Sequence, residues 1–231
     1  VRRVVRTKLL YITNTDTQEY TDEILASEEH QQLALEVAEK SMVLLKNDDD
    51  FLPLSAGEIE SLAVIGEIAD SDHTGDRGSS GTHPPYIITM LKGLQDYSNG
   101  SFEVIFDDGT DIESARQAAE RADAVVYVVG YKSEDEGEYI TSGDPEVAPE
   151  NQWGEGGDRP NLFLKPHDQN LFMESLPVNQ NSVVTLIGGS GIMTNTWDQL
   201  TPSILMAWYP GMMGGEALAN ILFGKVNPSG K

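Results

Sequence analysis

Ala124-Val125-Val126-Tyr127-Val128-Val129-Gly130 is the stretch of sequence, residues 124–130, that decides the fold. It is an unbroken apolar run, which is typical of a central parallel strand that is buried on both faces. Parallel neighbours in one sheet need a crossover connection between them, usually a helix. The stretch therefore predicts a sheet with helices packed on both of its sides.

The segments before and after this stretch alternate between strand and helix patterns. Shorter apolar runs predict strands at residues 62–66, 102–106, 182–187 and 203–208. Helical patterns lie between and after them, at residues 87–97, 112–122, 169–176 and 215–223. We expect an α/β fold, a mostly parallel sheet of about five or six strands flanked by helices in an α/β sandwich with flavodoxin-like layering.

The first part of the chain has a different pattern. Residues 1–11 predict the end of an amphipathic helix, and residues 14–21 are polar and predict a linker. Ser27, which two glutamates follow, predicts the start of a strong helix that ends near Asn47. The apolar positions of this helix are Leu33, Val37, Met42 and Leu45.

The chain is strongly acidic, with 38 Asp and Glu against 15 Lys and Arg and a formal net charge of −23. Such a surface repels nucleic acid and anionic membranes, so we expect neither as a partner. Two explanations of the charge stay open, solubility and adaptation to a saline medium.

The chain has no cysteine. No apolar run approaches the roughly 18 residues of a membrane helix, and we expect any secretion signal upstream of Val1.

Two long loops, residues 67–86 and 131–165, each follow the end of a predicted strand. Loops of this length inside a compact domain are usually functional. Open α/β sheets bind their ligands at the carboxyl ends of the strands. We therefore expect these two loops to form the working face of the domain.

Common motifs for cofactors, nucleophiles and metals are absent from the sequence. Residues 66–69 do not form a dinucleotide fingerprint. Residues 188–191, Gly-Gly-Ser-Gly, resemble a nucleophile elbow but lack its final glycine, because position 192 is Ile. The four histidines lack metal-ligand spacing. We expect neither a cofactor nor a metal.

Acidic residues crowd the start of the second loop, namely Glu134, Asp135, Glu136 and Glu138. Carboxylates this close disfavour each other's ionisation, so one of them can keep its proton near neutral pH. Glycoside hydrolysis needs a general acid with this property. A solvated acidic loop in an acidic protein explains the same residues, and this alternative stays open.

Several ordered motifs resemble one protein family. They are EKSMVLLKN (39–47), LPL (52–54), LAVIG (62–66), GDRGSS (75–80), PPY (84–86), EGEY (136–139), GDR (157–159), AWYPG (207–211), GGEALA (214–219), LFG (222–224) and NPSG (227–230). In this order and spacing the chain resembles the C-terminal α/β-sandwich domain of glycoside hydrolase family 3, and it is β-glucosidase-like in its closing motifs. The resemblance spans roughly residues 28–231.

The resemblance implies an active site built by two domains. A (β/α)8-type barrel on the N-terminal side supplies a nucleophilic aspartate, and the sandwich domain supplies an acid/base glutamate on a loop. Val1 to Leu10 resembles the last helix of such a barrel. We therefore expect residues 1–27 to be the end of an upstream barrel domain and a linker, and residues 28–231 to be the sandwich domain. Without its barrel, this chain is expected to be an inactive fragment.

The resemblance implies that Glu138 is the acid/base of a retaining exo-acting β-glycosidase, with Glu136 as the alternative. The sequence departs from the family pattern after this point, because Tyr139 and Ile140 follow and Gly-Asp-Arg comes only at 157–159. Candidate substrate-binding residues are Asp76, Arg77, Ser79 and Trp153. A structural pair of Asp76 with Arg77 is the alternative for those two residues.

The resemblance favours a β-linked glucoside or oligosaccharide as the substrate. A non-catalytic carbohydrate-binding or scaffold domain of the same fold is the second reading of the chain. A flavodoxin-like regulatory domain is a third. It would need a lysine partner for Asp107 and Asp108 after a later strand, and none is obvious.

Overall fold

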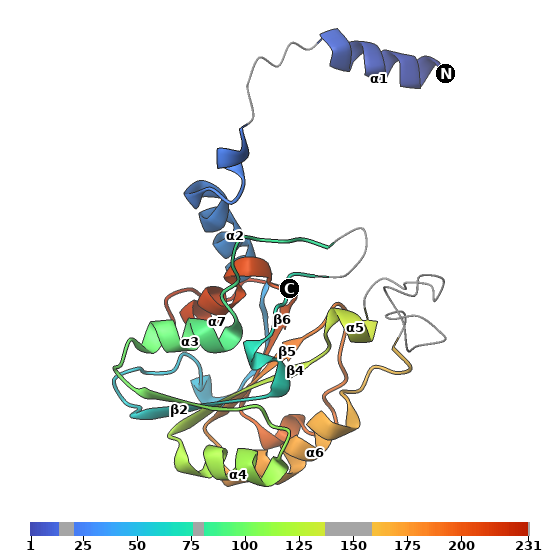
Figure 1. Cartoon of the computed structure of the whole chain (residues 1–231). Helices are drawn as coiled ribbons and strands as arrows, with labels where there is room; N and C mark the ends of the chain where they lie inside the picture. Colours follow the sequence, from blue (N-terminus) through green and yellow to red (C-terminus); the bar gives the residue numbers. More distant parts are fainter. Residues whose placement is uncertain (14–20, 76–80, 137–158, 231) are drawn as a thin grey trace.

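The computed structural model describes residues 1–13, 21–75, 81–136 and 159–230 (Figure 1). One sheet of six strands lies at its centre, in the order β1-β6-β5-β4-β2-β3. The strands are β1 (Val43–Asn47), β2 (Ser61–Ile65), β3 (Glu103–Asp107), β4 (Ala124–Gly130), β5 (Ser182–Ile187) and β6 (Ser203–Trp208). Only β1 pairs antiparallel with its neighbour, and the other pairs are parallel. The predicted α/β fold with a mostly parallel sheet is confirmed.

Helices cover both faces of the sheet (Figure 1). Helices α2, α3 and α7 pack on one face, and α4 and α6 pack on the other. The helices are α1 (Arg2–Thr13), α2 (Glu28–Ser41), α3 (Met90–Ser98), α4 (Ile112–Arg121), α5 (Ser133–Glu136), α6 (Pro166–Ser175) and α7 (Gly214–Leu222). Short 3-10 turns lie at Asp22–Ile24, Asp48–Asp50, Glu67–Asp70, Leu176–Val178, Asp198–Leu200 and Gly211–Met213.

Strand β4 is the centre of the core, and every one of its residues is buried. Side chains alternate between the two faces of a strand, so a strand covered on both faces can be apolar at every position. In β2, Leu62 and Val64 face one helical layer, whereas Ala63 and Ile65 face the other. This double burial explains why the runs at 62–66 and 124–130 show no polar alternation.

The predicted helix from Ser27 to Asn47 is correct only in its first part. Ser27 caps α2, since its hydroxyl accepts a hydrogen bond from the backbone N–H of His30. The helix ends at Ser41, and the next residues form β1, which pairs with β6. Hydrogen bonds to the open edge of β6 outweigh the local helical preference of this segment.

The apolar face predicted for this helix is also partly wrong. Leu33 and Val37 are exposed, with 55% and 58% of their surface accessible. Leu35 and Ala38 are buried instead, together with Met42 just after the helix. The buried face is set by the contact of α2 with α7, which the sequence pattern of α2 alone does not define.

Glycines allow the strands to leave the sheet at its carboxyl edge. Gly66, after β2, and Gly130, the last residue of β4, have φ angles of +137° and +134°. A Cβ atom at Gly66 would lie 2.0 Å from the carbonyl oxygen of Val128, and one at Gly130 would lie 2.0 Å from that of Ile187. Only glycine therefore fits at these two strand ends.

Helix α1 contributes no buried residue to the core. Its apolar side chains, among them Val5, Leu9 and Ile12, are exposed to solvent. Among the residues that the structure describes, no helix has both the length and the apolar character that crossing a bilayer requires.

Candidate active site at the carboxyl edge of the sheet

The segments that follow β4, β5 and β6 meet at one edge of the sheet. These strands are adjacent and parallel, so their carboxyl ends lie side by side. The chain after β4 enters the short helix α5, which ends at Glu136. The glycine turn 188–191 follows β5, and Tyr209 follows β6. The expectation that this edge gathers functional side chains can therefore be tested on Glu136 and its neighbours.

The carboxylate of Glu136 is enclosed by hydrogen-bond donors. Its Oε1 accepts from the hydroxyl of Tyr209 at 2.8 Å and from the backbone N–H of Gly189. Its Oε2 lies 2.9 Å from Nε of Arg159. The side chains of Glu136 and Arg159 are only 7% and 4% exposed, so this is a buried ion pair. Burial and the negative charge of Glu136 both raise the pKa of Tyr209, which therefore stays protonated and donates.

The guanidinium of Arg159 links this carboxylate to the turn after β5. Its Nη2 donates to the hydroxyl of Ser190 and to the carbonyl oxygen of Gly191, the latter at 2.8 Å. The guanidinium also lies over the ring of Tyr131, 4.3 Å from its centroid. Its Nη1 is buried and has no acceptor within the described part of the chain.

Further ion pairs surround this network. Lys165 Nζ lies 2.6 Å from Asp135 Oδ2, and Lys132 Nζ lies 2.7 Å from Glu67 Oε1. Near them, burial raises the pKa of Asp168 to about 6, although Lys165 and His167 act in the opposite direction. Asp135 and Glu136 thus each pair with a basic side chain. The cluster of acidic residues in the sequence did not indicate these pairs.

Most of the predicted site residues lie outside the described residues. These are Glu138, Asp76, Arg77, Ser79 and Trp153. Glu136 is the one member of the prediction that the structure describes, and it lies in the ion pair with Arg159. The sequence reasoning assigned no role to Arg159, Tyr209 or Gly189. In the sequence these three residues stand out only as members of the motifs GDR, AWYPG and GGSG. No rule of sequence spacing predicts that these motifs contact Glu136.

Metal binding has no candidate within the described ranges 1–13, 21–75, 81–136 and 159–230. No three His, Asp or Glu side chains there gather closely enough to hold an ion. The carboxylates of Asp135 and Glu136 instead pair with Lys165 and Arg159.

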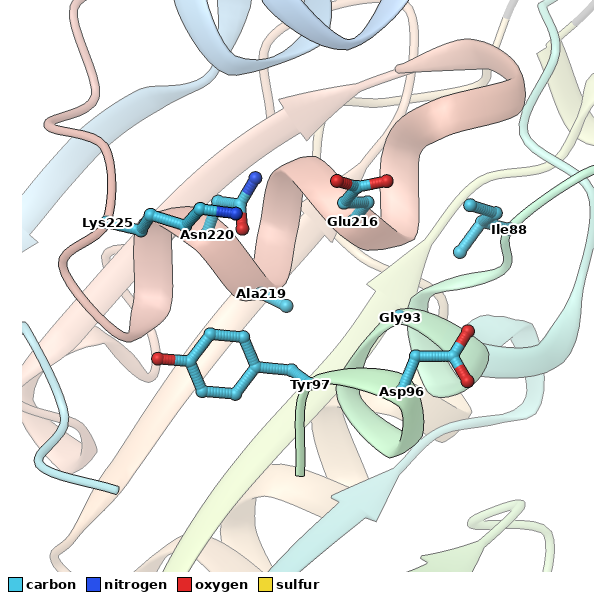
Figure 2. A pocket seen from close by; sticks show the side chains of 8 residues that line it. All are labelled: Ile88, Gly93, Asp96, Tyr97, Glu216, Ala219, Asn220 and Lys225. Atoms are coloured by element: carbon cyan, nitrogen blue, oxygen red, sulfur yellow. The ribbon is translucent and has the colours of Figure 1, made fainter. Parts of the chain in front are cut away.

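A separate pocket of about 200 Å³ lies between α3 and α7, away from the strand ends (Figure 2). Its lining residues are Ile88, Gly93, Asp96, Tyr97, Glu216, Ala219, Asn220 and Lys225. Two of its polar groups already have partners, since Asp96 pairs with Lys92 and Asn220 donates to Glu39. The pocket lies between two helices rather than at the strand ends, where open α/β sheets bind their ligands, and we place the candidate site at the carboxyl edge.

Comparison with known proteins identifies the family of the chain. Residues 42–231 match the glycosyl hydrolase family 3 C-terminal domain. The chain belongs to glycoside hydrolase family 3. The match covers all six strands of the sheet and leaves out residues 1–41, which include α1 and α2. The fold described above is therefore that of the family's C-terminal domain.

The family 3 relatives of this chain differ in their activities. A β-xylosidase of Formosa agariphila is 36% identical over 89% of this chain, which spans 28% of that protein. A β-glucosidase of Bacteroides ovatus is 34% identical over 90% of this chain and 29% of the relative. An exo-α-(1→6)-L-arabinopyranosidase of Bifidobacterium longum is 33% identical over 87% of this chain and 26% of the relative.

Solved family 3 structures share the fold. A β-glucosidase of Bifidobacterium adolescentis has a TM-score of 0.69 and 29% identity, over 98% of this chain and 31% of the other. A β-D-glucoside glucohydrolase of Trichoderma reesei has a TM-score of 0.78 and 23% identity, over 96% of this chain and 32% of the other. The chain thus spans about three-tenths of the length of the proteins that it matches.

Proposed function

We propose that this chain is the part of a retaining exo-acting β-glycosidase that supplies the acid/base glutamate, Glu138. The observation that carries the proposal is the family membership of the sandwich domain together with a long acidic segment after β4. In open α/β sheets this edge is where ligands bind. The relatives named above all hydrolyse glycosidic bonds, and a general acid is what such a reaction requires.

The surroundings of Glu136 favour Glu138 over Glu136 for this role. A general acid must reach the leaving-group oxygen of the substrate with a free carboxyl oxygen. Both oxygens of Glu136 already accept hydrogen bonds from protein groups, and the side chain is buried. Glu138 follows two residues later on the same loop and is the residue that the family pattern indicates.

In the proposed mechanism, Glu138 acts twice. It first donates a proton to the glycosidic oxygen while an aspartate attacks the anomeric carbon and the leaving group departs. It then takes a proton from water, which attacks the same carbon and releases the sugar with retained configuration. The two carboxyl groups in retaining enzymes lie about 5–5.5 Å apart.

The nucleophilic aspartate is proposed to come from a (β/α)8-type barrel upstream of this chain. The chain spans only about three-tenths of its relatives. The exposed apolar side chains of α1, such as Val5, Leu9 and Ile12, support a partner domain on that side, because such a stripe is normally covered. On its own, the chain is expected to release no aryl leaving group.

The substrate is proposed to be a β-linked glucoside or oligosaccharide. The closing motifs resemble the β-glucosidase branch of the family, and two β-glucosidases are among the similar proteins. Asp76, Arg77 and Ser79 are proposed to hydrogen-bond sugar hydroxyls, and Trp153 to stack on a sugar face.

The test uses the full-length protein that carries this domain. Aryl β-glucosides, β-xylosides and α-L-arabinopyranosides with a good leaving group are assayed with the wild type and with Glu138→Ala. We expect Glu138→Ala to lose at least about 10²-fold in kcat and azide to restore the rate. The product should be a glycosyl azide of retained configuration. Glu150→Ala, another glutamate in the same segment, is the control and should keep wild-type activity.

Two results would overturn the proposal. Near wild-type activity of Glu138→Ala would show that the acid/base lies elsewhere, with Glu136→Ala as the next variant to assay. Full-length wild type without activity on any of the three glycosides would favour the non-catalytic carbohydrate-binding or scaffold domain.

A further inference from the structure

The pocket between α3 and α7 contains three polar groups that have no partner in the described part of the protein. They are the hydroxyl of Tyr97, the carboxylate of Glu216 and the ammonium of Lys225. Within the described residues, none of the three takes part in a hydrogen bond or an ion pair. Glu216 is half-buried in the first turn of α7. Polar groups that are partly enclosed are normally satisfied by protein, water or a ligand, so these three are available to bind a ligand.

The fold holds the pocket in one shape. The ring of Tyr97 stacks on Phe223, with 4.3 Å between the centroids and 10° between the ring planes. The backbone of Lys225 lies in the turn that ends α7, where the N–H of Val226 donates to the carbonyl oxygen of Asn220 at 3.1 Å. A site that is already formed loses little conformational entropy when a ligand binds.

Apolar surface forms the wall between the polar groups. Ile88, Gly93 and Ala219 line the pocket. Backbone hydrogen bonds attach Ile88 to the start of α7, because its N–H donates to Met212 at 2.8 Å and its carbonyl oxygen accepts from Gly215 at 2.9 Å. Figure 2 shows the side chains of Lys225 and Glu216 toward different ends of this wall. The pocket thus combines a rigid apolar surface with a few separated polar groups, which is typical of sites for small molecules.

The free charges of the pocket balance each other. Asp96 pairs with Lys92, so its negative charge is already compensated. One negative group, Glu216, and one positive group, Lys225, are left. An anion would be repelled by the first and a cation by the second. A ligand without net charge that carries both donors and acceptors satisfies both groups.

We propose that this pocket binds a sugar ring, as a carbohydrate site separate from the active site. Sugar hydroxyl groups donate and accept, so one can donate to Glu216 while another accepts from Lys225. The C–H groups of the sugar can pack on the apolar wall and on Tyr97. The volume of about 200 Å³ far exceeds the roughly 10–15 Å³ that one water molecule needs.

A zwitterionic amino acid is the other neutral ligand that matches one carboxylate and one ammonium. The family decides between the two, because the chain belongs to the glycoside hydrolases, whose substrates are sugars. The inference depends on this membership and on the geometry of the pocket. It goes beyond the proposed function and does not depend on which residue is the acid/base.

The test maps sugar binding on the 231-residue chain by NMR, since this chain contains the whole sheet and both helical layers. Wild type, Glu216→Gln, Lys225→Met and the double variant, labelled with ¹⁵N, are titrated with methyl β-D-glucoside and methyl β-D-xyloside. In wild type we expect shifts of the amide signals of Gly93, Ala219 and Lys225. The dissociation constant should be about 1 mM, as for a ligand of about a dozen heavy atoms. Each single variant should bind at least about fivefold more weakly, since it loses a hydrogen bond to a charged group.

Controls separate sugar binding from changes of fold and from charge effects. Glu174 is exposed on α6, on the other face of the sheet, and Glu174→Gln should bind as wild type. Amide signals outside the pocket that match those of wild type show that each variant is folded. The affinity for a neutral sugar should change less than about twofold between roughly 0.01 M and 1 M sodium chloride.

Three outcomes would overturn the proposal. In the first, the sugars shift the amide signals of Gly189 and Gly191 but none in the pocket, which would place sugar binding at the carboxyl edge. In the second, wild type and the double variant bind the glycosides equally well. In the third, free serine shifts the pocket signals in place of the glycosides and its affinity falls with salt, so that the pocket binds a zwitterion. The proposed function stands in all three cases, because the pocket lies away from the carboxyl edge.

Discussion

At the scale of single residues, burial gives the carboxylates of the carboxyl edge different properties. Glu136 is buried against a full set of donors and a guanidinium. Asp168, which lies in the first turn of α6, is half-buried with weaker compensation, and desolvation raises its pKa to about 6. Asp168 therefore changes its charge in a pH range where most aspartates are already ionised.

Asp168 should make the stability of the domain depend on pH. Its folded pKa of about 6 exceeds the unfolded value of about 3.9, so its contribution is complete below pH 4 and is lost as pH rises through 6. Two pKa units correspond to about 3 kcal/mol, and partial exposure to solvent reduces this to roughly 1–2 kcal/mol. We expect the free energy of unfolding of Asp168→Asn, relative to wild type, to rise by this amount from pH 4 to pH 7.5.

Urea unfolding at the two pH values measures this difference directly. The other titrating groups, including Lys165, His167 and Glu67 around the site, are common to both proteins and cancel in the comparison. A difference between Asp168→Asn and wild type that is constant with pH would contradict a raised pKa at Asp168.

At the scale of secondary-structure elements, α3 and α7 pack at a distance that only glycine allows. A Cβ atom at Gly93 would lie 2.0 Å from the carbonyl oxygen of Gly215. A Cβ atom at Gly215 would lie 1.9 Å from the carbonyl oxygen of Thr89. The two helices thus meet backbone to backbone, and this contact sets how tightly their layer covers the sheet.

Gly93→Ala should destabilise the domain, although alanine is ordinarily the better helix former by about 1 kcal/mol. The added methyl group forces the helices apart, and overpacking of this kind costs about 1–3 kcal/mol. Denaturant unfolding of the 231-residue chain measures the change. Gly57→Ala is the matched control, because no atom lies within 4 Å of a Cβ there. Equal stabilities of Gly93→Ala and wild type would show that the layer tolerates a wider helix spacing.

At the scale of the whole molecule, charge is the dominant property. The formal net charge is −23. Ion pairs do not reduce it, because every Lys and Arg is already counted in this balance. Like charges on one small domain repel each other and oppose compaction. Salt screens this repulsion, because the Debye length falls from about 10 Å at 0.1 M to about 3 Å at 1 M.

The melting temperature should therefore rise with sodium chloride at pH 7. At pH values near the isoelectric point of about 4.3, the repulsion vanishes and the salt dependence should vanish with it. Thermal melts followed by circular dichroism at both pH values test this expectation. A melting temperature at pH 7 that does not change with salt would assign the acidity to solubility alone.

The N-terminal helix should be dispensable for the stability of the sandwich. None of its residues is buried, so deletion of residues 1–20 is expected to change the free energy of unfolding by less than about 0.5 kcal/mol. Urea unfolding of the shortened and the complete chain gives the comparison. A clear loss of stability would mean that α1 packs on the sandwich.

The sequence by itself determined the architecture of the sheet. The apolar runs at 62–66, 102–106, 124–130, 182–187 and 203–208 all became strands, because burial on both faces removes polar residues and leaves a local signal. The cap at Ser27 was likewise readable, since a cap depends on residues within one turn. The order of motifs identified the family, whereas Glu138 as the acid/base stays a prediction.

Tertiary structure decided what depends on contacts between distant residues. The segment after Ser41 became β1 rather than helix because β6, more than 150 residues later, offers it an open edge. Glu136 became a buried partner of Arg159, Gly189 and Tyr209, which lie on three different segments. A local sequence pattern indicates whether a residue is buried, but it does not indicate which distant residues it contacts. The contacts of Glu136 therefore appear only in the folded chain.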